Sequence, residues 1–378
     1  MRRVLSFLST PLLLIAITAA VAMLGSSFGD ASLRRIVVGA LVNMVAVIGI
    51  YVFVGMTGVF SFGQLAFMAI GAYTTAVLTV PIASKSALFE GMPQWLVDAH
   101  LPSLLAILVG AVVAGLVALV LSVPMSRMNE MTASLATLAI LVAVYVVAGN
   151  WTAVTNGSKG ITAIPVDTTL VTALIAVGVV ILAVWFFQES SLGLKIRATR
   201  EDAVASRAIG ISVGVSRGVA FVVSGFVVGI AGGLYALLQG SLSPSAFYIG
   251  PTFILIAMLV VGGMTSLTGA VIGTILITML RRLLQEVEGG LQLGPLELPG
   301  RPGITEVGLG IALLLILAFR RRGVTGGKEL TWSALVRFAR RLTRRGAPER
   351  SEARPVTAAA ADGEPAAPMA EANAGEQR

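Results

Sequence analysis

The sequence predicts an all-α, polytopic membrane protein with about ten transmembrane helices, some short or broken, and with both termini in the cytoplasm. Hydrophobic residues make up 56% of the 378 residues and charged residues only 12%, against about 25% charged in a typical soluble domain. Seven stretches of the chain carry no charge, and the longest of them covers residues 218–280. A crossing needs about 20 apolar residues, so these stretches hold one to three crossings each.

The first apolar segment follows Arg2 and Arg3, a pattern that also fits a signal peptide. The spans that follow at once favour a first transmembrane helix instead. Polar loops then separate the apolar segments at 82–100, 150–167 and 189–217. Clearly apolar segments lie at about residues 5–24, 35–53, 61–81, 101–124, 131–149, 168–187, 219–238 and 307–319.

Residues 252–280 are apolar but interrupted by Gly262, Gly263 and Gly269. The pieces, of roughly 12 to 16 residues, are short for full crossings. We therefore expect two half-spans or two short packed spans, because broken helices need protein or a water-filled cavity around them. Two crossings bring the total to ten and place the acidic loop 286–306 outside, as the positive-inside rule favours. Arg281 and Arg282 then lie near the outer face, which that rule does not favour.

The chain divides into three predicted regions. Residues 1–322 form a transmembrane permease domain, 323–345 a basic amphipathic juxtamembrane helix, and 346–378 a disordered cytoplasmic tail. The net charge of +8 is concentrated in residues 320–345, which carry nine basic residues and one acidic residue. A basic cluster directly after a last span indicates an anchor to lipid headgroups, so we expect a bilayer and no nucleic acid as its partner.

The residue inventory excludes most catalytic and metal chemistry. The chain has no cysteine and a single histidine, His100, which excludes disulfides and Cys/His zinc sites. The predicted spans contain no Asp, Glu, His or Lys to act as a general base, and the Gly-Gly-Lys at 326–328 lacks the P-loop pattern. We therefore expect no catalytic residue, no metal site and no cofactor in this chain. Any driving force for transport would come from elsewhere.

The charged segment 197–211 lies between two spans on the predicted cytoplasmic side. Glu201 and Asp202 begin a predicted helix of roughly nine residues, where carboxylates favour the positive end of the helix dipole, and Gly210 ends it. Such a short helix can dock into a groove of a soluble partner. A solvated linker is the alternative interpretation.

The polar residues within the predicted spans are neutral, which suits a path for a small solute without a coupling ion. Gln64 is one candidate for that path, although small residues spaced as in this segment also indicate simple helix packing. The candidate path residues are Asn43, Ser61, Gln64, Tyr73, Gly262, Gly263 and Ser266.

Several motifs, taken as a set, resemble those of one transporter family. Glu201-Asp202 with Ala205 and Gly210-Ile211 resembles the cytoplasmic coupling loop of ABC importer permeases. The other motifs are Gly63-Gln64, Gly71-Ala72-Tyr73, Ser224-Gly225, Gly232-Gly233-Leu234-Tyr235, Ser243-Pro244 and the run from Gly262 to Gly269. Over about residues 35–320 the chain is similar to the LivM-type permease subunit of branched-chain amino acid ABC transporters, the LivH/LivM family.

The resemblance implies a permease of the plasma or inner membrane that translocates leucine, isoleucine and valine by alternating access, driven by ATP. It implies a LivH-like second permease, two cytoplasmic ABC ATPase subunits that bind the ATP, and an extracytoplasmic solute-binding protein. The ATPase-coupling residues would be Arg200, Glu201, Asp202, Ala205, Gly210 and Ile211.

Two alternatives stay open from the sequence. The solute could be urea, a short amide or another small neutral molecule, because a neutral path accepts these as well as a zwitterion. A self-contained secondary transporter or channel is the alternative from another class. Neighbouring genes for an ATPase and a solute-binding protein would favour the importer.

Overall fold

The computed structural model describes residues 2–27, 31–89, 91–289, 292–293, 296–297, 303–320, 323–327 and 329. These residues belong to one compact unit, Met1–Trp332. Of the predicted basic juxtamembrane helix 323–345, only residues 323–327 and 329 are described, and they form turns and irregular chain rather than a helix. The rest of that segment and the predicted tail 346–378 lie outside the described residues.

Long helices build the bundle. They are α1 (Arg2–Ser27), α2 (Ala31–Ile50) with the π-helical turn η1 (Tyr51–Gly55), α3 (Gln64–Thr79), α6 (Ser103–Met125), α7 (Glu130–Asn150), α9 (Leu170–Glu189), α12 (Val213–Gln239), α13 (Ile249–Gly262), α14 (Leu267–Glu288) and α15 (Ile304–Phe319).

Short elements connect them. They are α4 (Ile82–Leu88), α5 (Gln94–Val97), α8 (Thr152–Thr155), η2 (Gly157–Lys159), α10 (Ser191–Glu201), α11 (Ala203–Ala208), η3 (Pro244–Phe247) and the antiparallel two-residue strands β1 (Gln292–Leu293) and β2 (Leu296–Glu297).

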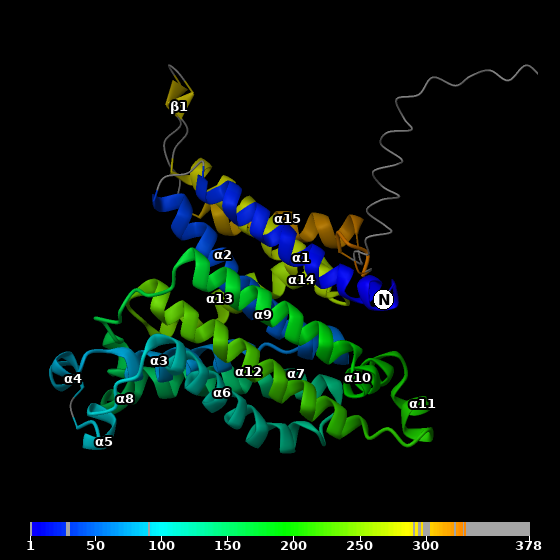
Figure 1. Cartoon of the computed structure of the whole chain (residues 1–378), viewed down its shortest axis with the longest axis horizontal. Helices are drawn as coiled ribbons and strands as arrows, with labels where there is room; N and C mark the ends of the chain where they lie inside the picture. The colour runs from blue at the N-terminus through cyan, green and yellow to red at the C-terminus, as the bar shows by residue number, and fades with distance from the viewer. Residues whose placement is uncertain are drawn as a thin grey trace, which may run out of the picture. The chain divides into compact units, whose positions relative to one another are not determined.

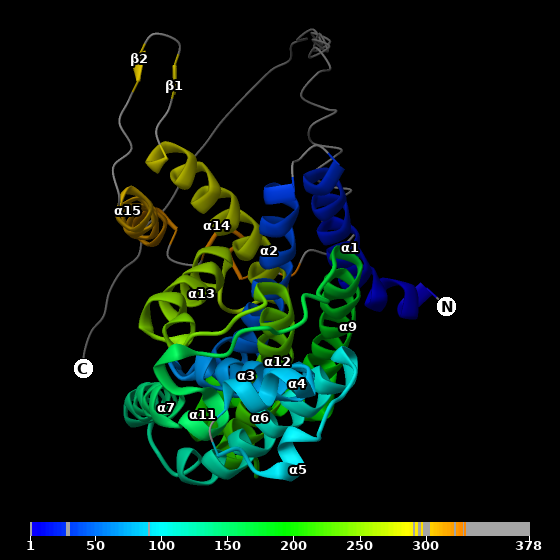
Figure 2. The ribbon, with the colours of Figure 1, turned by 90° about the vertical axis from the view of Figure 1, so that its left-hand side faces the viewer.

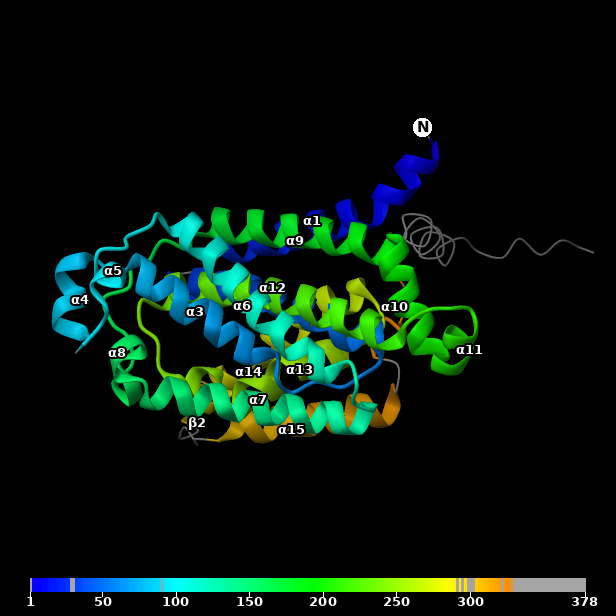
Figure 3. The same cartoon turned by 90° about the horizontal axis from the view of Figure 1, so that it is seen from below.

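The predicted polytopic all-α architecture is confirmed. Among the described residues, eight helical segments are long and apolar enough to cross a membrane, and α3 and the apolar part of α15 are shorter. In Figures 1 and 3, α10 and α11 lie at one end of the bundle and α4, α5 and α8 at the other. We call these the α11 end and the α4 end. Helix α1 begins and α15 ends at the α11 end, as an even number of crossings requires (Figure 3).

The structure corrects the predicted extent of the broken region 252–280. Helix α14 has 22 residues and continues through Arg281 and Arg282 to Glu288, so it has membrane length. The break covers only residues 263–266 and begins at Gly263, whose φ of 120° few other residues adopt. Gly269 does not interrupt α14. It lies where α13 and α14 cross, and a Cβ added to Gly262 would lie 1.8 Å from its carbonyl oxygen.

Helix α12 packs against α3, α6 and α2, and this group forms the core of the bundle. Glycine allows the close approach, because a Cβ on Gly232 of α12 would lie 2.0 Å from the carbonyl oxygen of Met68 in α3. Such contacts between small residues are the usual way in which membrane helices associate without a hydrophobic driving force. Helices α13, α14 and α15 gather on the other side of α2 (Figure 2). Helix α2 therefore contacts both groups.

Candidate functional site

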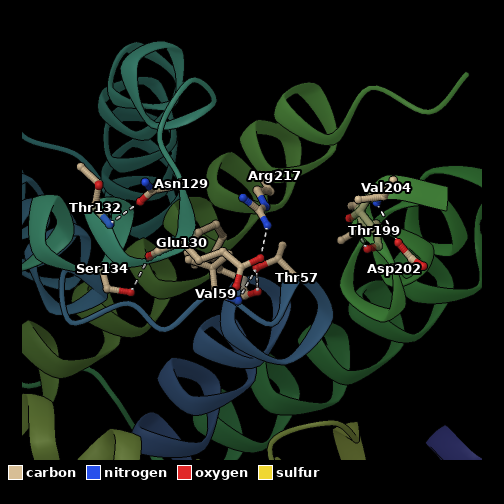
Figure 4. A network of polar contacts seen from close by, with 12 residues as sticks. Thr57, Val59, Asn129, Glu130, Thr132, Ser134, Thr199, Asp202, Val204 and Arg217 are labelled. Carbon is tan, nitrogen blue, oxygen red and sulfur yellow. Dashed lines mark hydrogen bonds and ion pairs between the residues drawn. The ribbon is translucent and has the colours of Figure 1, made fainter. Parts of the chain in front are cut away.

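The predicted coupling residues come together where α10 meets α11. Asp202 lies between the two helices and caps α11, since its Oδ1 accepts hydrogen bonds from the amides of Val204 (2.8 Å) and Ala205 (2.9 Å), as Figure 4 shows for Val204. These bonds hold the pKa of the Asp202 carboxyl below its usual range, and the bond from Ala205 has the larger effect. Gly210 follows the helix with a φ of 83°, the conformation of a glycine helix stop.

The predicted start of this helix is only partly correct. Asp202 is its N-cap, but Glu201 is the last residue of the preceding helix, α10, and α11 has six residues rather than nine. The chain breaks at Asp202 because its side chain competes for the backbone amides that follow it. Glu201 instead accepts hydrogen bonds from Arg200, which lower the pKa of its carboxyl.

Arg200 connects the coupling segment to the break that follows α2. Its Nη1 donates to the carbonyl oxygen of Gly55 at 2.7 Å, and its aliphatic stem packs over Gly58, whose φ is 76°. An exposed ion pair such as Arg200–Glu201 contributes about 0–1 kcal/mol, whereas a hydrogen bond from a charged group contributes roughly 1.5–3 kcal/mol. The bond to Gly55 therefore makes the larger contribution.

Helix α11 presents a surface suited to a protein partner. Val204 of α11 and Ile209, which directly follows the helix, are apolar yet 74% and 75% exposed, while Ser206 is buried. Ile211 closes the turn by donating its amide to the Ser206 carbonyl at 2.9 Å. A hollow of about 880 Å³ adjoins the helix and is lined by residues of the α6–α7 connection, α11 and the start of α12, among them Arg127, Glu130, Ala203, Arg207 and Arg217.

An ion pair fixes one wall of that hollow. Arg217 of α12 donates to the carboxylate of Glu130 at the start of α7, as Figure 4 shows. Ser134 lies one helical turn after Glu130 in α7, and its hydroxyl donates to the carbonyl of Phe60 at 2.7 Å. The α6–α7 connection, α12 and the loop before α3 are therefore joined at the α11 end.

The predicted path residues do not form one cluster. Gly262, Gly263 and Ser266 lie in the α13–α14 turn at the α11 end, where Ser266 caps α14. Residues 323–327 pack on this turn, and the Thr325 amide donates to the Gly262 carbonyl at 3.1 Å. A Cβ on Gly55 would lie 2.3 Å from the carbonyl oxygen of Met264 in the same turn. Gly55 is thus in contact with both Arg200 and the α13–α14 turn.

Gln64 and Ser61 lie together in the packed interior. Gln64 is 1% exposed, its Oε1 accepts a hydrogen bond from the Ser224 hydroxyl at 3.0 Å, and its Nε2 donates to Ser61 at 3.4 Å. Ser224 also donates to the Gly49 carbonyl of α2 at 2.6 Å. Gln64 therefore joins α3, α12 and α2 in this conformation and does not line an open space.

Tyr73 is buried near the α4 end, separate from the other path candidates. Its ring packs against Phe247 with the centroids 6.1 Å apart. Its hydroxyl is buried and has no hydrogen-bond partner among the described residues.

One predicted path residue, Asn43, lines a cavity of about 490 Å³ between α2, α12, α13 and α14. Ser32 and Asn43 of α2 both line it, and a helix rises 1.5 Å per residue, so the cavity extends about 16 Å along α2. Three arginines, at positions 35, 281 and 282, line its wall toward the α4 end.

These arginines were not among the predicted site residues. The predicted apolar region ends at residue 280, so Arg281 and Arg282 fell outside the predicted spans. Their conflict with the positive-inside rule could have identified them. Ionisable residues that a membrane helix retains often mark a solute pathway.

A family model described as branched-chain amino acid transport system, permease component, matches residues 32–319. The chain belongs to this permease family. The permease is 26% identical, over 280 residues, to the high-affinity branched-chain amino acid transport system permease protein LivM of Escherichia coli (strain K12). It is 27% identical, over the same length, to the protein of that name from Salmonella typhimurium.

Each alignment covers 65% of this permease and 62% of the relative, so the chain matches less than two thirds of the length of these curated relatives. No solved structure matches it. Family membership confirms the predicted LivM-type resemblance and a multi-pass protein of the inner membrane. It also agrees with the prediction that the chain is not an enzyme, since its relatives are transport permeases.

Proposed function

We propose that this permease is one of two membrane subunits of an ATP-driven ABC importer that translocates leucine, isoleucine and valine by alternating access. The names of its relatives support the substrate class. Coupling to an ATPase is supported by one observation at the α11 end. There the exposed, capped helix α11 is joined through Arg200 to the break after α2.

In this proposal the ATPase pushes on α11, and Arg200 transmits the movement. The guanidinium holds the carbonyl of Gly55, and Gly55 is in contact with Met264 of the α13–α14 turn. A displacement of α10 and α11 would therefore reach both α2 and the α13–α14 hairpin, which are walls of the cavity that Asn43 lines. Packed elements of this kind shift between discrete arrangements rather than deforming continuously.

The partners of the proposed importer are a LivH-like second permease, two cytoplasmic ABC ATPase subunits and an extracytoplasmic solute-binding protein. The ATPases would bind the ATP, so the permease itself needs no cofactor. Its α11 end would face the cytoplasm, in keeping with the positive-inside rule.

The test is uptake of radiolabelled leucine, isoleucine and valine by cells that lack this permease, beside cells in which it is restored. Loss of all three activities with rescue is the expected result. Unchanged uptake, with the partner subunits expressed, would contradict the proposed substrates and direct the search to urea and short amides. Uptake that persists after deletion of the ATPases would contradict the importer and favour a self-contained transporter.

A further inference from the structure

The cavity between α2, α12, α13 and α14 is positively charged. Three arginines line it, and no acidic side chain does so among the described residues. The hollow at the α11 end differs, because there arginines and Glu130 line the same space. A low-dielectric cavity with one sign of charge concentrates ions of the opposite sign, so it favours an anionic group.

The three arginines are not equivalent. Arg282 donates to Glu286 at 2.8 Å, and Arg35 donates to the Gln239 side chain at 3.4 Å. The Nε of Arg281 is buried and has no hydrogen-bond partner in the described part of the chain. Arg281 is therefore the arginine available to a ligand.

A second unpartnered group lies one helical turn before Arg281. Thr278 also lines the cavity, and its hydroxyl is buried and has no hydrogen-bond partner among the described residues. Residues three apart on a helix share a face, so Thr278 and Arg281 can contact the same group. Buried donors without acceptors are uncommon and costly, and a carboxylate can accept from both an Arg and a hydroxyl.

Arg281 lies within α14, a helix long and apolar enough to cross a membrane, 14 residues or about 21 Å along it from Leu267. An arginine within a spanning helix is costly and typically faces a cavity or a partner.

Apolar side chains make up much of the remaining lining of the cavity. Its lining includes Leu65, Met68, Leu238, Ile254, Leu255 and Met258. Its volume of about 490 Å³ is within the roughly 300–1,000 Å³ of small-molecule sites. Asn43 lies deeper along α2 and adds a neutral polar group that can accept from an ammonium.

We propose that Arg281 and Thr278 bind the carboxylate of the transported solute, while its aliphatic side chain packs against the apolar wall. The inference rests on the proposed function and narrows it, because urea and simple amides have no carboxylate for Arg281. An acidic side chain of a docking protein also presents a carboxylate and is the alternative partner for Arg281. Because the Arg281 Nε and the Thr278 hydroxyl are both buried beside a cavity of small-molecule size, a small solute is favoured over a protein surface.

The absence of cysteine from the chain allows a direct test, since Thr278→Cys introduces its only thiol. In membranes that contain the assembled transporter, the thiol reacts with a sulfonate-bearing methanethiosulfonate and, separately, with its trimethylammonium counterpart. Mass spectrometry of this chain follows each reaction. Each rate is divided by the rate of the same reagent with a small free thiol, which removes the difference in intrinsic reactivity. We expect a preference of at least about fivefold for the anionic reagent.

Matched charge variants show whether Arg281 causes the preference. Arg281→Gln in the Thr278→Cys background should abolish it, whereas Arg34→Gln, which removes a charge from the same end of the bundle outside the cavity, should leave it. Equal rates for both reagents in all backgrounds would overturn the proposal. Gln285→Cys, also in the cavity lining, replaces Thr278→Cys if that thiol does not react.

Protection by ligands separates a solute from a protein. Leucine and 3-methylbutanoate should slow the labelling, and 3-methylbutanamide, of nearly the same shape but uncharged, should not. Protection by the solute-binding protein without its solute, and none by 3-methylbutanoate, would overturn the proposal in favour of a docking contact.

Uptake then separates this inference from the proposed function. Arg281→Gln should lower leucine uptake about tenfold, the effect expected from loss of one charge-assisted hydrogen bond, and Arg281→Lys should retain more uptake than Arg281→Gln. If the unmodified permease carries leucine and Arg281→Gln carries it equally well, only the inference fails. If the unmodified permease carries no leucine, the proposed function fails, and protection by 3-methylbutanoate still decides the carboxylate site.

Discussion

The two ends of this permease differ in how their charged side chains are paired. At the α11 end, Asp202 accepts from two amides, and Glu201 and Glu130 each accept from an arginine. At the α4 end, the cavity contains an arginine with a buried, unpartnered Nε and no acidic lining among the described residues. Charged groups whose hydrogen bonds are satisfied within the protein stabilise one arrangement of the backbone. A buried donor without an acceptor can instead form its hydrogen bond with a ligand. The difference agrees with the two proposals, in which the first end transmits force and the second receives the solute.

The largest expected effect compares two glycines of the same helix, α13. A Cβ on Gly262, at the α11 end, would lie 1.8 Å from the carbonyl of Gly269, whereas a Cβ on Gly250, at the α4 end, would meet nothing within 4 Å. We expect Gly262→Ala to reduce the amount of folded permease in membranes at least about tenfold, because overpacking against rigid backbone typically destabilises by several kcal/mol when nothing can move aside.

Gly250→Ala is the matched control and should leave the amount of folded permease unchanged. Detergent extraction followed by size-exclusion chromatography measures both variants. Equal yields would show that the α13–α14 hairpin is not the rigid element that the comparison of the two ends requires.

The next effect concerns transmission through Arg200. Arg200→Ala removes the hydrogen bond to Gly55 and the packing over Gly58, so we expect leucine uptake to fall about tenfold while ATP hydrolysis continues. Glu201→Lys, which replaces the carboxylate beside Arg200 with a like charge, should uncouple transport in the same direction. Proteoliposomes with the complete transporter allow both rates to be measured.

Lys195→Ala provides the control for this effect, because Lys195 is an exposed residue of the same helix, α10. It should transport normally. Normal uptake by Arg200→Ala would contradict a role of the α11 end in transmission and would leave it as a docking surface alone.

The smallest effect concerns the cap of α11 and its dependence on pH. Because its hydrogen bonds lower the folded pKa of Asp202, the stabilisation that its ionised form gives is present above the usual carboxyl pKa of about 4 and is lost only as the pH falls through the lower folded value. We expect hydrogen exchange of the Val204 and Ala205 amides, corrected for intrinsic rates, to be constant between about pH 7 and pH 5.

Asp202→Ala should speed this exchange throughout that range, and Asp202→Asn, whose side-chain oxygen also accepts, should largely preserve protection. Uptake should change less than about threefold in either variant, because a single cap typically makes a modest contribution. Loss of protection already near pH 6 would show that the α11 end is less firmly held than the comparison implies.

Local patterns predicted much of this architecture. Charge-free runs of spanning length located the helices, because each crossing must bury its own apolar surface and satisfy its own backbone. Gly210 ended α11 as predicted, since a glycine stop depends only on local conformation. The segment 197–211 was predicted as one unit, but the structure divides it at Asp202 between α10 and α11.

Long-range contacts explain what the sequence did not predict. Glycine weakens a helix locally, yet Gly269 lies inside α14 because α13 packs against it, a partner that no local pattern reveals. The same limit applies to Arg200, whose principal partner is Gly55, 145 residues away. The predicted path residues were chosen for their polarity or, for the glycines, for the break in the helix. Of these residues only Asn43 lines the cavity, whereas Gln64 makes hydrogen bonds between helices in this conformation.

One carboxylate beyond α15 connects the chain back to the start of α14. Glu329 accepts hydrogen bonds from the amides of Leu267 (2.8 Å) and Thr268 (3.1 Å) at the first turn of that helix. A change in the number of residues between α15 and Glu329 would therefore disturb the start of α14. The same contact guides engineering: an affinity tag or fluorescent fusion that keeps Glu329 retains these two bonds, whereas one that replaces Glu329 removes them and leaves the Ser266 cap of this turn in place.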